Sequence, residues 1–183
     1  MTTAVQPPVL DPSLFRRVLG HVPTAVTVIT ATTPDGPVGL TVGTFTSISL
    51  DPALVGFFAT STSRSLRSVL DAGRFTANVL GDKQAHVSKA FAGRDTDRFA
   101  TIGWQPSAAG SPRLDDALAW VDCTVTSTTV MGDHTAVVAQ VDALDVVQHS
   151  GHPLLFFRGT YCHLDSRTLP RHGDWRLDHY ADW

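Results

Sequence analysis

The stretch that decides the fold reads WVDCTVTSTTV over residues 120–130, MGDH over residues 131–134 and TAVVAQVDALDVV over residues 135–147. Apolar and polar residues alternate from Val121 to Thr126, as in a strand that packs one face on a core. Gly132-Asp133 has the composition of a tight turn. This segment therefore predicts a long antiparallel hairpin whose second strand runs back over residues 135–147.

The rest of the chain predicts further strands, mostly in sequence-adjacent pairs. A TPDG turn at residues 33–36 joins the first two, and Asp51-Pro52 separates the next two. Residues 54–59 are apolar throughout, which predicts a strand covered on both sides. The predicted strands are residues 25–30, 38–41, 45–50, 54–59, 75–80, 120–130, 135–147 and 154–163.

Three short helices are expected between these strands. Asp11 can cap the first, with Pro12 at its first position, and Gly20 can end it. The second spans residues 63–72 and stops at Gly73, and the third spans residues 82–91 with Asp82 as its cap. Residues 95–113, rich in Gly and Pro, are expected to form a loop. The pattern excludes a doubly wound parallel sheet and predicts a mostly-β, closed or nearly closed antiparallel barrel with a few short peripheral helices.

Composition limits the class of protein further. With 183 residues, 43% hydrophobic and 17% charged, the chain suits one globular domain. Its net charge of −3 and pI near 6.2 argue against nucleic acid or an anionic membrane as the main partner. No apolar run approaches the roughly 20 residues of a membrane span. Residues 1–12 are expected to be a flexible arm without a signal peptide, residues 13–165 the domain, and residues 166–183 a tail.

Cysteine usage and the absence of common motifs limit the class of protein further. Cys123 and Cys162 form no C-x-x-C pair and are interpreted as packing residues in a reducing, cytoplasmic protein. The chain has no G-x-G-x-x-G, P-loop, G-x-S-x-G or H-E-x-x-H motif. His149 and His152 lie three apart in a loop but have no third ligand nearby, so no metal site is predicted.

Two polar stretches can bind a ligand. Residues 39–52, GLTVGTFTSISLDP, place glycines and hydroxyls beside a strand, where backbone groups can approach a planar or anionic ligand. Thr60–Ser65, TSTSRS, ends a strand and opens a helix, which suits a phosphate group. We call Thr60–Ser65 the cradle segment. The alternatives are an ordinary Thr/Ser-rich strand for the first stretch and an ordinary helix cap for the second.

Several stretches, taken together in order, resemble the flavin reductase family, the small reductase partners of two-component flavin monooxygenases. They cover about residues 13–163, and their order and spacing make the resemblance specific. The stretches are PTAVTVIT (residues 23–30), residues 39–52, SRS (63–65), GRFTANVL (73–80), DRF (97–99), GDH (132–134) and LLFFRGTY (154–161). Ala25 stands where the family usually has glycine, and Gly43-Thr44 stands where two small polar residues are common.

The resemblance implies a split antiparallel β-barrel, usually a homodimer, that binds FMN or FAD and uses NADH or NADPH. It also implies that reduced flavin passes to a separate flavin-dependent oxygenase. By this likeness the isoalloxazine is held by Gly43, Thr44, Phe45, Thr46, Ser47 and Ser49, and the ribityl phosphate by Thr60, Ser61, Ser63, Arg64 and Ser65.

Four more residues receive roles from the resemblance. Phe91 is expected to line the far side of the flavin, and Arg158 and Tyr161 the nicotinamide side. His134 is expected to orient the nicotinamide or relay a proton. His134 can instead be a polar turn residue, and Arg158 can instead pair with a carboxylate such as Asp133.

Three other functions stay open at this point. One is a flavin-binding electron carrier of the same fold without reductase turnover. Another is a split-barrel oxidase or reductase that acts on another substrate, such as a deazaflavin-linked enzyme. The third is a structural or ligand-sensing barrel without redox chemistry. Polar residues 39–52 and the cradle segment argue against this third interpretation.

Overall fold

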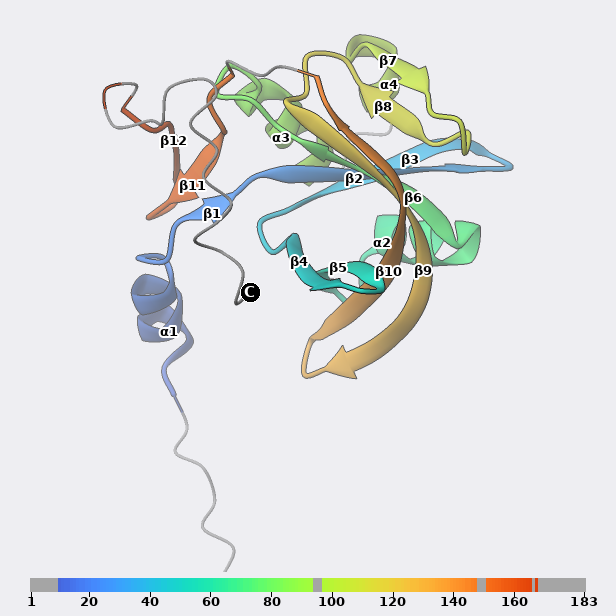
Figure 1. The fold of residues 1–183 in the computed structure, drawn as a ribbon. Helices are drawn as coiled ribbons and strands as arrows, with labels where there is room; N and C mark the ends of the chain where they lie inside the picture. The colour runs from blue at the N-terminus through green and yellow to red at the C-terminus, as the bar shows by residue number, and fades with distance from the viewer. Residues whose placement is uncertain (1–9, 94–96, 148–150, 166, 168–183) are drawn as a thin grey trace, which may run out of the picture.

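A curved antiparallel sheet forms most of the molecule. The computed structural model describes residues 10–93, 97–147, 151–165 and 167. Seven strands lie in the order β3-β2-β6-β9-β10-β5-β4, and every neighbouring pair is antiparallel. The strands are β2 (Thr27–Thr33), β3 (Gly36–Val42), β4 (Thr46–Leu50), β5 (Ala53–Thr60), β6 (Arg74–Val79), β9 (Ala119–Met131) and β10 (His134–Val146). The sheet bends so that β3 also contacts β5, which gives the split barrel seen in Figure 1.

Two smaller sheets accompany the barrel. One joins β1 (Thr24–Ala25), β11 (Leu155–Phe157) and β12 (Thr160–Cys162), and the other pairs β7 (Trp104–Pro106) with β8 (Pro112–Leu114). The prediction of one strand over residues 154–163 is wrong. Both Arg158 and Gly159 have positive φ angles, and two such values in succession reverse the chain into a hairpin. The prediction of a loop over residues 95–113 is also wrong, since β7, β8 and a short helix lie there.

Three of the described helices lie close to the predicted residues, and the fourth, α4 (Arg98–Thr101), was not predicted. The other three are α1 (Pro12–Leu19), α2 (Arg64–Ala72) and α3 (Ala85–Ala92). The Asp11 side chain caps α1, and Gly73 ends α2 in the left-handed conformation. The prediction that Asp82 caps the third helix is wrong. This helix begins after Gln84, and the Asp82 carboxylate lies 3.9 Å from His152. None of the described helices is long and apolar enough to cross a membrane.

The core consists of two clusters. The larger one packs the sheet against α2, and the smaller one lies between β2, α3 and β8. Phe58 of β5 is 43% exposed, so the prediction that this strand is covered on both faces is wrong at that position. Cys123 is buried in the larger cluster, and burial raises the pKa of its thiol to about 12. It is therefore a neutral packing residue, and both cysteines are free.

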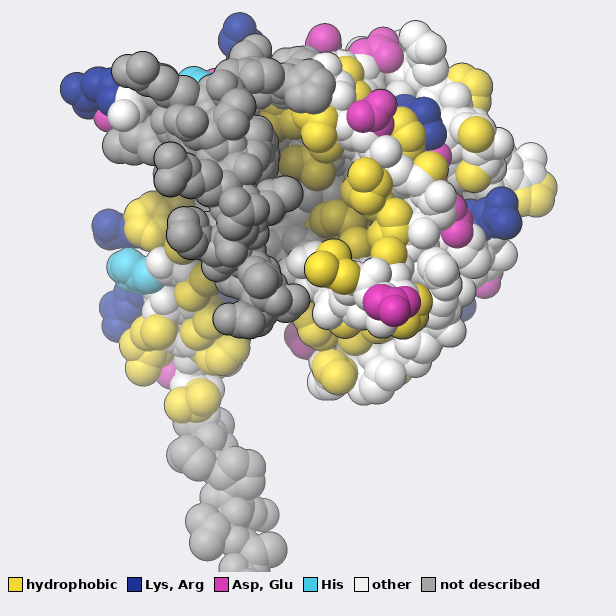
Figure 2. Space-filling model, in the orientation of Figure 1, with side chains coloured by type: hydrophobic (Ala, Val, Ile, Leu, Met, Phe, Trp, Pro, Cys, Tyr) yellow, Lys and Arg dark blue, Asp and Glu magenta, His cyan; other side chains and the backbone are white. Residues whose placement is uncertain are grey.

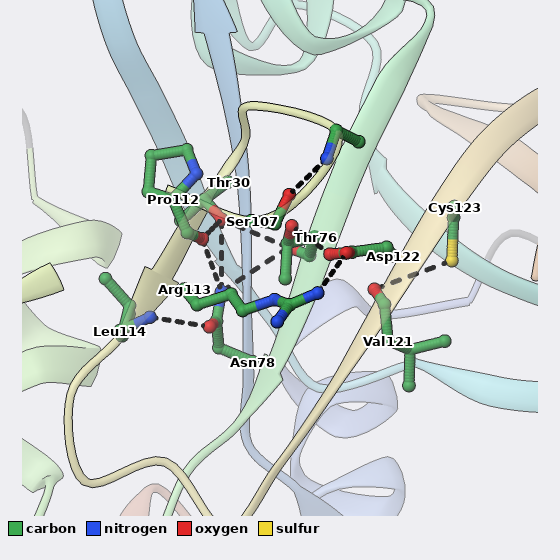
Figure 3. A network of polar contacts seen from close by, with 11 residues as sticks. Thr30, Thr76, Asn78, Ser107, Pro112, Arg113, Leu114, Val121, Asp122 and Cys123 are labelled. Carbon is green, nitrogen blue, oxygen red and sulfur yellow. Dashed lines mark hydrogen bonds and ion pairs between the residues drawn. The ribbon is translucent and has the colours of Figure 1, made fainter. Parts of the chain in front are cut away.

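A buried polar network ties β8 to the sheet (Figure 3). The Asn78 side chain accepts a hydrogen bond of 2.8 Å from the backbone N–H of Leu114. Its amide donates to the backbone oxygen of Val28 and to the Thr30 hydroxyl. Beside it, Asp122 accepts hydrogen bonds of 2.6 Å from Thr76 and from Arg113. Among the described residues, Nε of Arg113 is a buried side-chain atom without a hydrogen-bond partner, while the other polar groups named here are paired. A buried polar group that loses its partner is costly.

Replacing Asn78 with alanine tests this network. We expect Asn78→Ala to lower the free energy of unfolding in urea by about 2–4 kcal/mol, since each buried group left unpaired costs about 1–3 kcal/mol. Thr126→Ala is the control, because the exposed Thr126 hydroxyl also donates to a backbone oxygen. Its cost is expected to stay within about 1 kcal/mol. Equal losses for the two variants would contradict the prediction.

Candidate functional site

The end of β5 and the start of β10 bring two predicted elements together. In the antiparallel register, Thr60 is the direct partner of His134. The backbone N–H of Ser61 donates to the oxygen of Asp133 at 3.0 Å, and the Ser61 hydroxyl lies 2.9 Å from that of Thr135. The cradle segment and His134, far apart in the sequence, are therefore fixed side by side by backbone hydrogen bonds.

The cradle segment continues into the first turn of α2. The Ser63 hydroxyl caps this helix by accepting from the N–H of Leu66 at 3.2 Å, and the N–H of Ser63 donates to the oxygen of Thr60 at 2.9 Å. Arg64 follows with an exposed side chain. The first N–H groups of a helix have no partner within the helix, so this end suits an anion. The local fold therefore keeps the polar groups predicted for a phosphate close to one another.

A cleft of about 740 Å³ opens over the cradle segment. Four of its lining residues belong to the predicted phosphate site, while Ser61 is not among them. None of the described lining residues carries a carboxylate. They are Pro37, Val38, Gly39, Thr60, Thr62, Ser63, Arg64, Ser65, Ser68, Ala92, Gly93, Arg98 and Phe99.

The stretch predicted for the isoalloxazine runs along the sheet edge. Among the described strands, β4 pairs only with β5, so the backbone groups on its outer side point away from the sheet. Gly43, Thr46 and Ser47 are exposed and Ser49 is half-buried, and the ladder shifts register between Ser47 and Ser49. This edge can offer backbone N–H and C=O groups to a flat ligand.

Two residues of this stretch are used by the fold itself. The Thr44 hydroxyl accepts from the N–H of Phe58 at 2.9 Å and donates to the oxygen of the same residue at 3.0 Å. It extends the β4–β5 pairing beyond the end of the ladder. Phe45 packs against the larger core cluster. These two residues can therefore contact a ligand mainly through their backbone groups.

His134 is held by its neighbour in the turn. Its Nδ1 atom lies 2.7 Å from Oδ1 of Asp133, while its side chain stays 44% exposed. The hydrogen bond and the charge of His134 lower the pKa of the Asp133 carboxyl below its ordinary value. Asp133 therefore stays ionised and fixes the direction of the imidazole ring, leaving Nε2 for another partner.

The other predicted residues lie elsewhere in this single chain. Phe91 is 2% exposed and packs against Gly39, but it does not itself line the cleft. The Tyr161 hydroxyl lies 2.9 Å from that of Ser88, and the N–H of Arg158 donates to the oxygen of Gly20. Figure 1 shows the β11–β12 hairpin well apart from the β9–β10 turn, so an Arg158–Asp133 pair is not formed.

Sequence reasoning did not assign a role to several residues of the cleft. Arg98, Phe99 and Ser68 also line the cleft. The DRF stretch at residues 97–99 resembles the family but by itself indicates no role. A cleft built from β3, α2, α3 and α4 joins segments that no local pattern connects.

A second cleft lies on another part of the surface. Its volume is about 830 Å³, and its lining includes Gly81–Gln84, Asp115 and His152. It shares no residue with the cleft over the cradle segment. Among the described residues no group of three or more His, Cys, Asp or Glu is arranged to hold a metal ion. His149, considered above with His152, lies outside the described residues.

The split barrel places a helix start under a cleft whose described lining residues include no carboxylate, an arrangement that can accept an anion. The chain belongs to the family described as the flavin reductase like domain, which it matches over residues 19–165.

Individual relatives agree with this assignment. The chain is 44% identical over 171 residues to the flavin-dependent monooxygenase reductase subunit HsaB of Mycobacterium tuberculosis, covering 92% of this chain and 90% of that protein. The crystal structure of nitrilotriacetate monooxygenase component B from Mycobacterium thermoresistibile has a TM-score of 0.84 at 43% identity, covering 91% and 93% of the two chains. The Streptomyces globisporus NADH:FAD oxidoreductase SgcE6, solved with NAD and FAD fragments, has a TM-score of 0.82 at 28% identity, covering 89% and 100%.

Proposed function

We propose that this protein is a flavin reductase that takes hydride from NADH and supplies reduced flavin to a separate monooxygenase. The observation that carries the proposal is the meeting of the cradle segment with His134 beside the open edge of β4, in a chain of the flavin reductase family. The relative from Mycobacterium tuberculosis is named as the reductase subunit of a flavin-dependent monooxygenase, which supports this role.

The protein's own residues have binding and orienting roles in this reaction. The flavin, when bound, supplies N5 as the hydride acceptor for nicotinamide C4, so no protein nucleophile is needed. The cradle segment and the start of α2 bind the phosphate. Backbone N–H groups near Thr44–Ser47 stabilise the negative charge that develops on reduction. His134, held by Asp133, orients the nicotinamide.

An open site suits a reductase that releases its product. The β4 stretch is largely exposed, and the cleft over the cradle segment is open to solvent. Flavin is therefore held with moderate affinity and leaves after reduction. A purified protein that gives up its flavin only on denaturation would contradict this part of the proposal.

NADH oxidation tests the function directly. We expect purified protein to oxidise NADH, followed by its absorbance, when FMN or FAD is added, and to show only background oxidation without flavin. NADPH in place of NADH is expected to give a higher KM. Flavin binding without turnover by either nicotinamide would contradict the proposal and favour an electron carrier of the same fold.

The Arg64→Met variant tests whether turnover depends on phosphate binding by the cradle segment. Removing the guanidinium is expected to raise the KM for FMN about tenfold, since one charge-assisted hydrogen bond is worth about 1.5–3 kcal/mol. Riboflavin, which has no phosphate, is the control substrate, and its KM is expected to be the same in both proteins.

His134→Ala tests the role of the histidine. Loss of one hydrogen bond to the nicotinamide is expected to raise the KM for NADH about tenfold, which is about 1.4 kcal/mol. Asp133→Ala keeps the ring but releases it, and a smaller rise of about threefold is expected. The flavin affinity of both variants, measured by fluorescence quenching, is expected to stay within twofold of the wild-type value. Thr128→Ala on β9 is the control, and its KM for NADH is also expected to stay within twofold of the wild-type value. An unchanged KM and kcat in His134→Ala would contradict this role and leave His134 as a polar turn residue.

Exposed apolar side chains suggest that a second copy covers this surface. On α1, Leu14, Phe15 and Val18 are 42%, 53% and 55% exposed, and the helix has no buried residue. On the β4–β5 edge, Ile48 and Leu50 are 51% and 85% exposed. Figure 2 shows hydrophobic side chains gathered on α1 and around the β4–β5 region. Apolar surface of this extent on a small domain favours association, and we propose a homodimer.

Charges placed on this surface test the homodimer. We expect the wild-type protein to have twice its chain mass of 19.6 kDa in size-exclusion chromatography with light scattering. Phe15→Glu combined with Leu50→Glu is expected to yield the 19.6 kDa monomer, because a buried unpaired charge is costly. Ala108→Glu, on the exposed β7–β8 turn, is the control and is expected to stay dimeric. A wild-type monomer would contradict the proposal.

A further inference from the structure

One methionine of the chain lies on the surface beside the candidate site. The sequence has two methionines, Met1 and Met131, and Met1 lies outside the described residues. Met131 is the last residue of β9, is 54% exposed and belongs to neither core cluster. Methionine side chains usually fill gaps in a core, where their flexibility helps packing. Since Met131 has no such role, its thioether is open to reagents in the solvent.

The strand register places Met131 next to His134. Met131 is the direct partner of His134 across the β9–β10 turn, and His134 is the direct partner of Thr60. Directly opposite residues of an antiparallel pair point to the same face of the sheet, with Cβ atoms roughly 4.5–5.5 Å apart. Met131, His134 and Thr60 therefore form a row on one face, and the thioether lies beside the proposed nicotinamide contact.

The other described sulfur atoms are less open to oxidation. Cys123 is 1% exposed, and burial raises the pKa of its thiol to about 12, so the thiol stays neutral. Cys162 is half-buried on β12, which Figure 1 shows well apart from the β9–β10 turn. A thiol reacts with peroxide as its thiolate, whereas a thioether carries no proton and reacts without ionisation. Among the described residues, Met131 is therefore the sulfur site that peroxide reaches most readily.

The proposed reaction supplies peroxide when its product is not used. Reduced flavin that leaves the site and meets no oxygenase reacts with dioxygen, giving oxidised flavin and hydrogen peroxide. The peroxide then transfers one oxygen atom to the thioether. The O–O bond breaks, an S–O bond forms, the sulfur is oxidised by two electrons, and water leaves with both peroxide protons. The product, methionine sulfoxide, is polar and can be returned to the thioether by sulfoxide reductases.

We propose that Met131 is a site of peroxide modification through which unused reduced flavin slows its own production. This inference rests on the proposed flavin reductase function. The sulfoxide puts a polar, hydrated group beside His134, in place of the apolar thioether. NADH then binds less tightly, and less hydride reaches the flavin until the sulfoxide is reduced.

Turnover in air tests the modification. Wild-type protein is incubated with NADH, FMN and a free methionine derivative, N-acetylmethionine amide, which reports peroxide in solution. Peptide mass spectrometry is expected to find one added oxygen atom on Met131, and almost none when dioxygen is excluded or catalase is added. Hydrogen peroxide added to resting protein, without NADH, is expected to give the same product. Unmodified Met131 in either arm, with the reporter oxidised, would overturn the proposal.

The KM for NADH tests the consequence. After peroxide treatment the wild-type KM is expected to rise about fourfold, the equivalent of one methylene group that no longer packs on the ligand. In Met131→Leu, which is apolar but has no sulfur, the KM is expected to stay within about twofold of its own value before treatment. Met131→Gln resembles the sulfoxide in polarity and is expected to show the raised KM without peroxide. An oxidised Met131 with an unchanged KM, or an equal rise in Met131→Leu, would overturn the proposal.

Repair of the oxidised protein separates this effect from general damage. Treatment with a methionine sulfoxide reductase is expected to restore the KM of the untreated protein. A raised KM that persists after Met131 has been repaired would overturn the proposal. Normal turnover together with a Met131 that resists added peroxide would overturn this inference alone. Absence of NADH oxidation by the untreated protein with any flavin would overturn both this inference and the proposed function.

Discussion

The antiparallel register between β5 and β10 is the constraint on which the candidate site depends. It runs from the pair His134 and Thr60 to the pair Gln140 and Leu54 without a shift. Side chains alternate along a strand, so a slip by one residue would turn every side chain of β10 to the opposite face. The core prevents this slip, because Val137 and Phe57, which face each other in the register, are both 1% exposed. Hydrophobic packing therefore determines where His134 lies relative to the cradle segment.

A second link between core and site runs through α2. Leu66 and Val69 are 2% and 0% exposed, so one side of this helix is fixed on the sheet. The N–H of Leu66 is also the group that the Ser63 hydroxyl caps. A residue that anchors the helix in the core thus also holds the first turn of the predicted phosphate site. Sites built on such packed elements are more rigid than sites on loops alone, which suits a protein that must orient two ligands rather than react with them.

The parts that could be predicted from the sequence are those with strong local signals. The long hairpin of β9 and β10, the caps of α1 and α2 and the antiparallel class followed from alternation, turn chemistry and capping residues. The hairpin of β11 and β12 was missed because the apolar residues before Arg158 favour one continuous strand. The positive φ values at Arg158 and Gly159, which make the turn, give no clear signal in the sequence. Thr44 and Phe45 were predicted to contact the flavin through backbone groups and hydroxyls, which stays a prediction. Packing adds that the Thr44 hydroxyl bonds β5 and that Phe45 packs on the core. Arg98 and Phe99 had no predicted role, since the cleft they line is assembled from four distant segments.

The position of the site on an edge strand has its own physical consequence. The outer backbone groups of β4 are unpaired in the sheet, and apolar side chains lie beside them. Such an open edge favours aggregation, because it can pair with any other exposed strand. The Thr44 hydroxyl protects one end by satisfying the backbone of Phe58. The rest of the edge has to be covered in another way. A flat ligand that hydrogen-bonds this edge, together with the proposed second copy over Ile48 and Leu50, would cover it. Ligand binding and association would then stabilise the same surface.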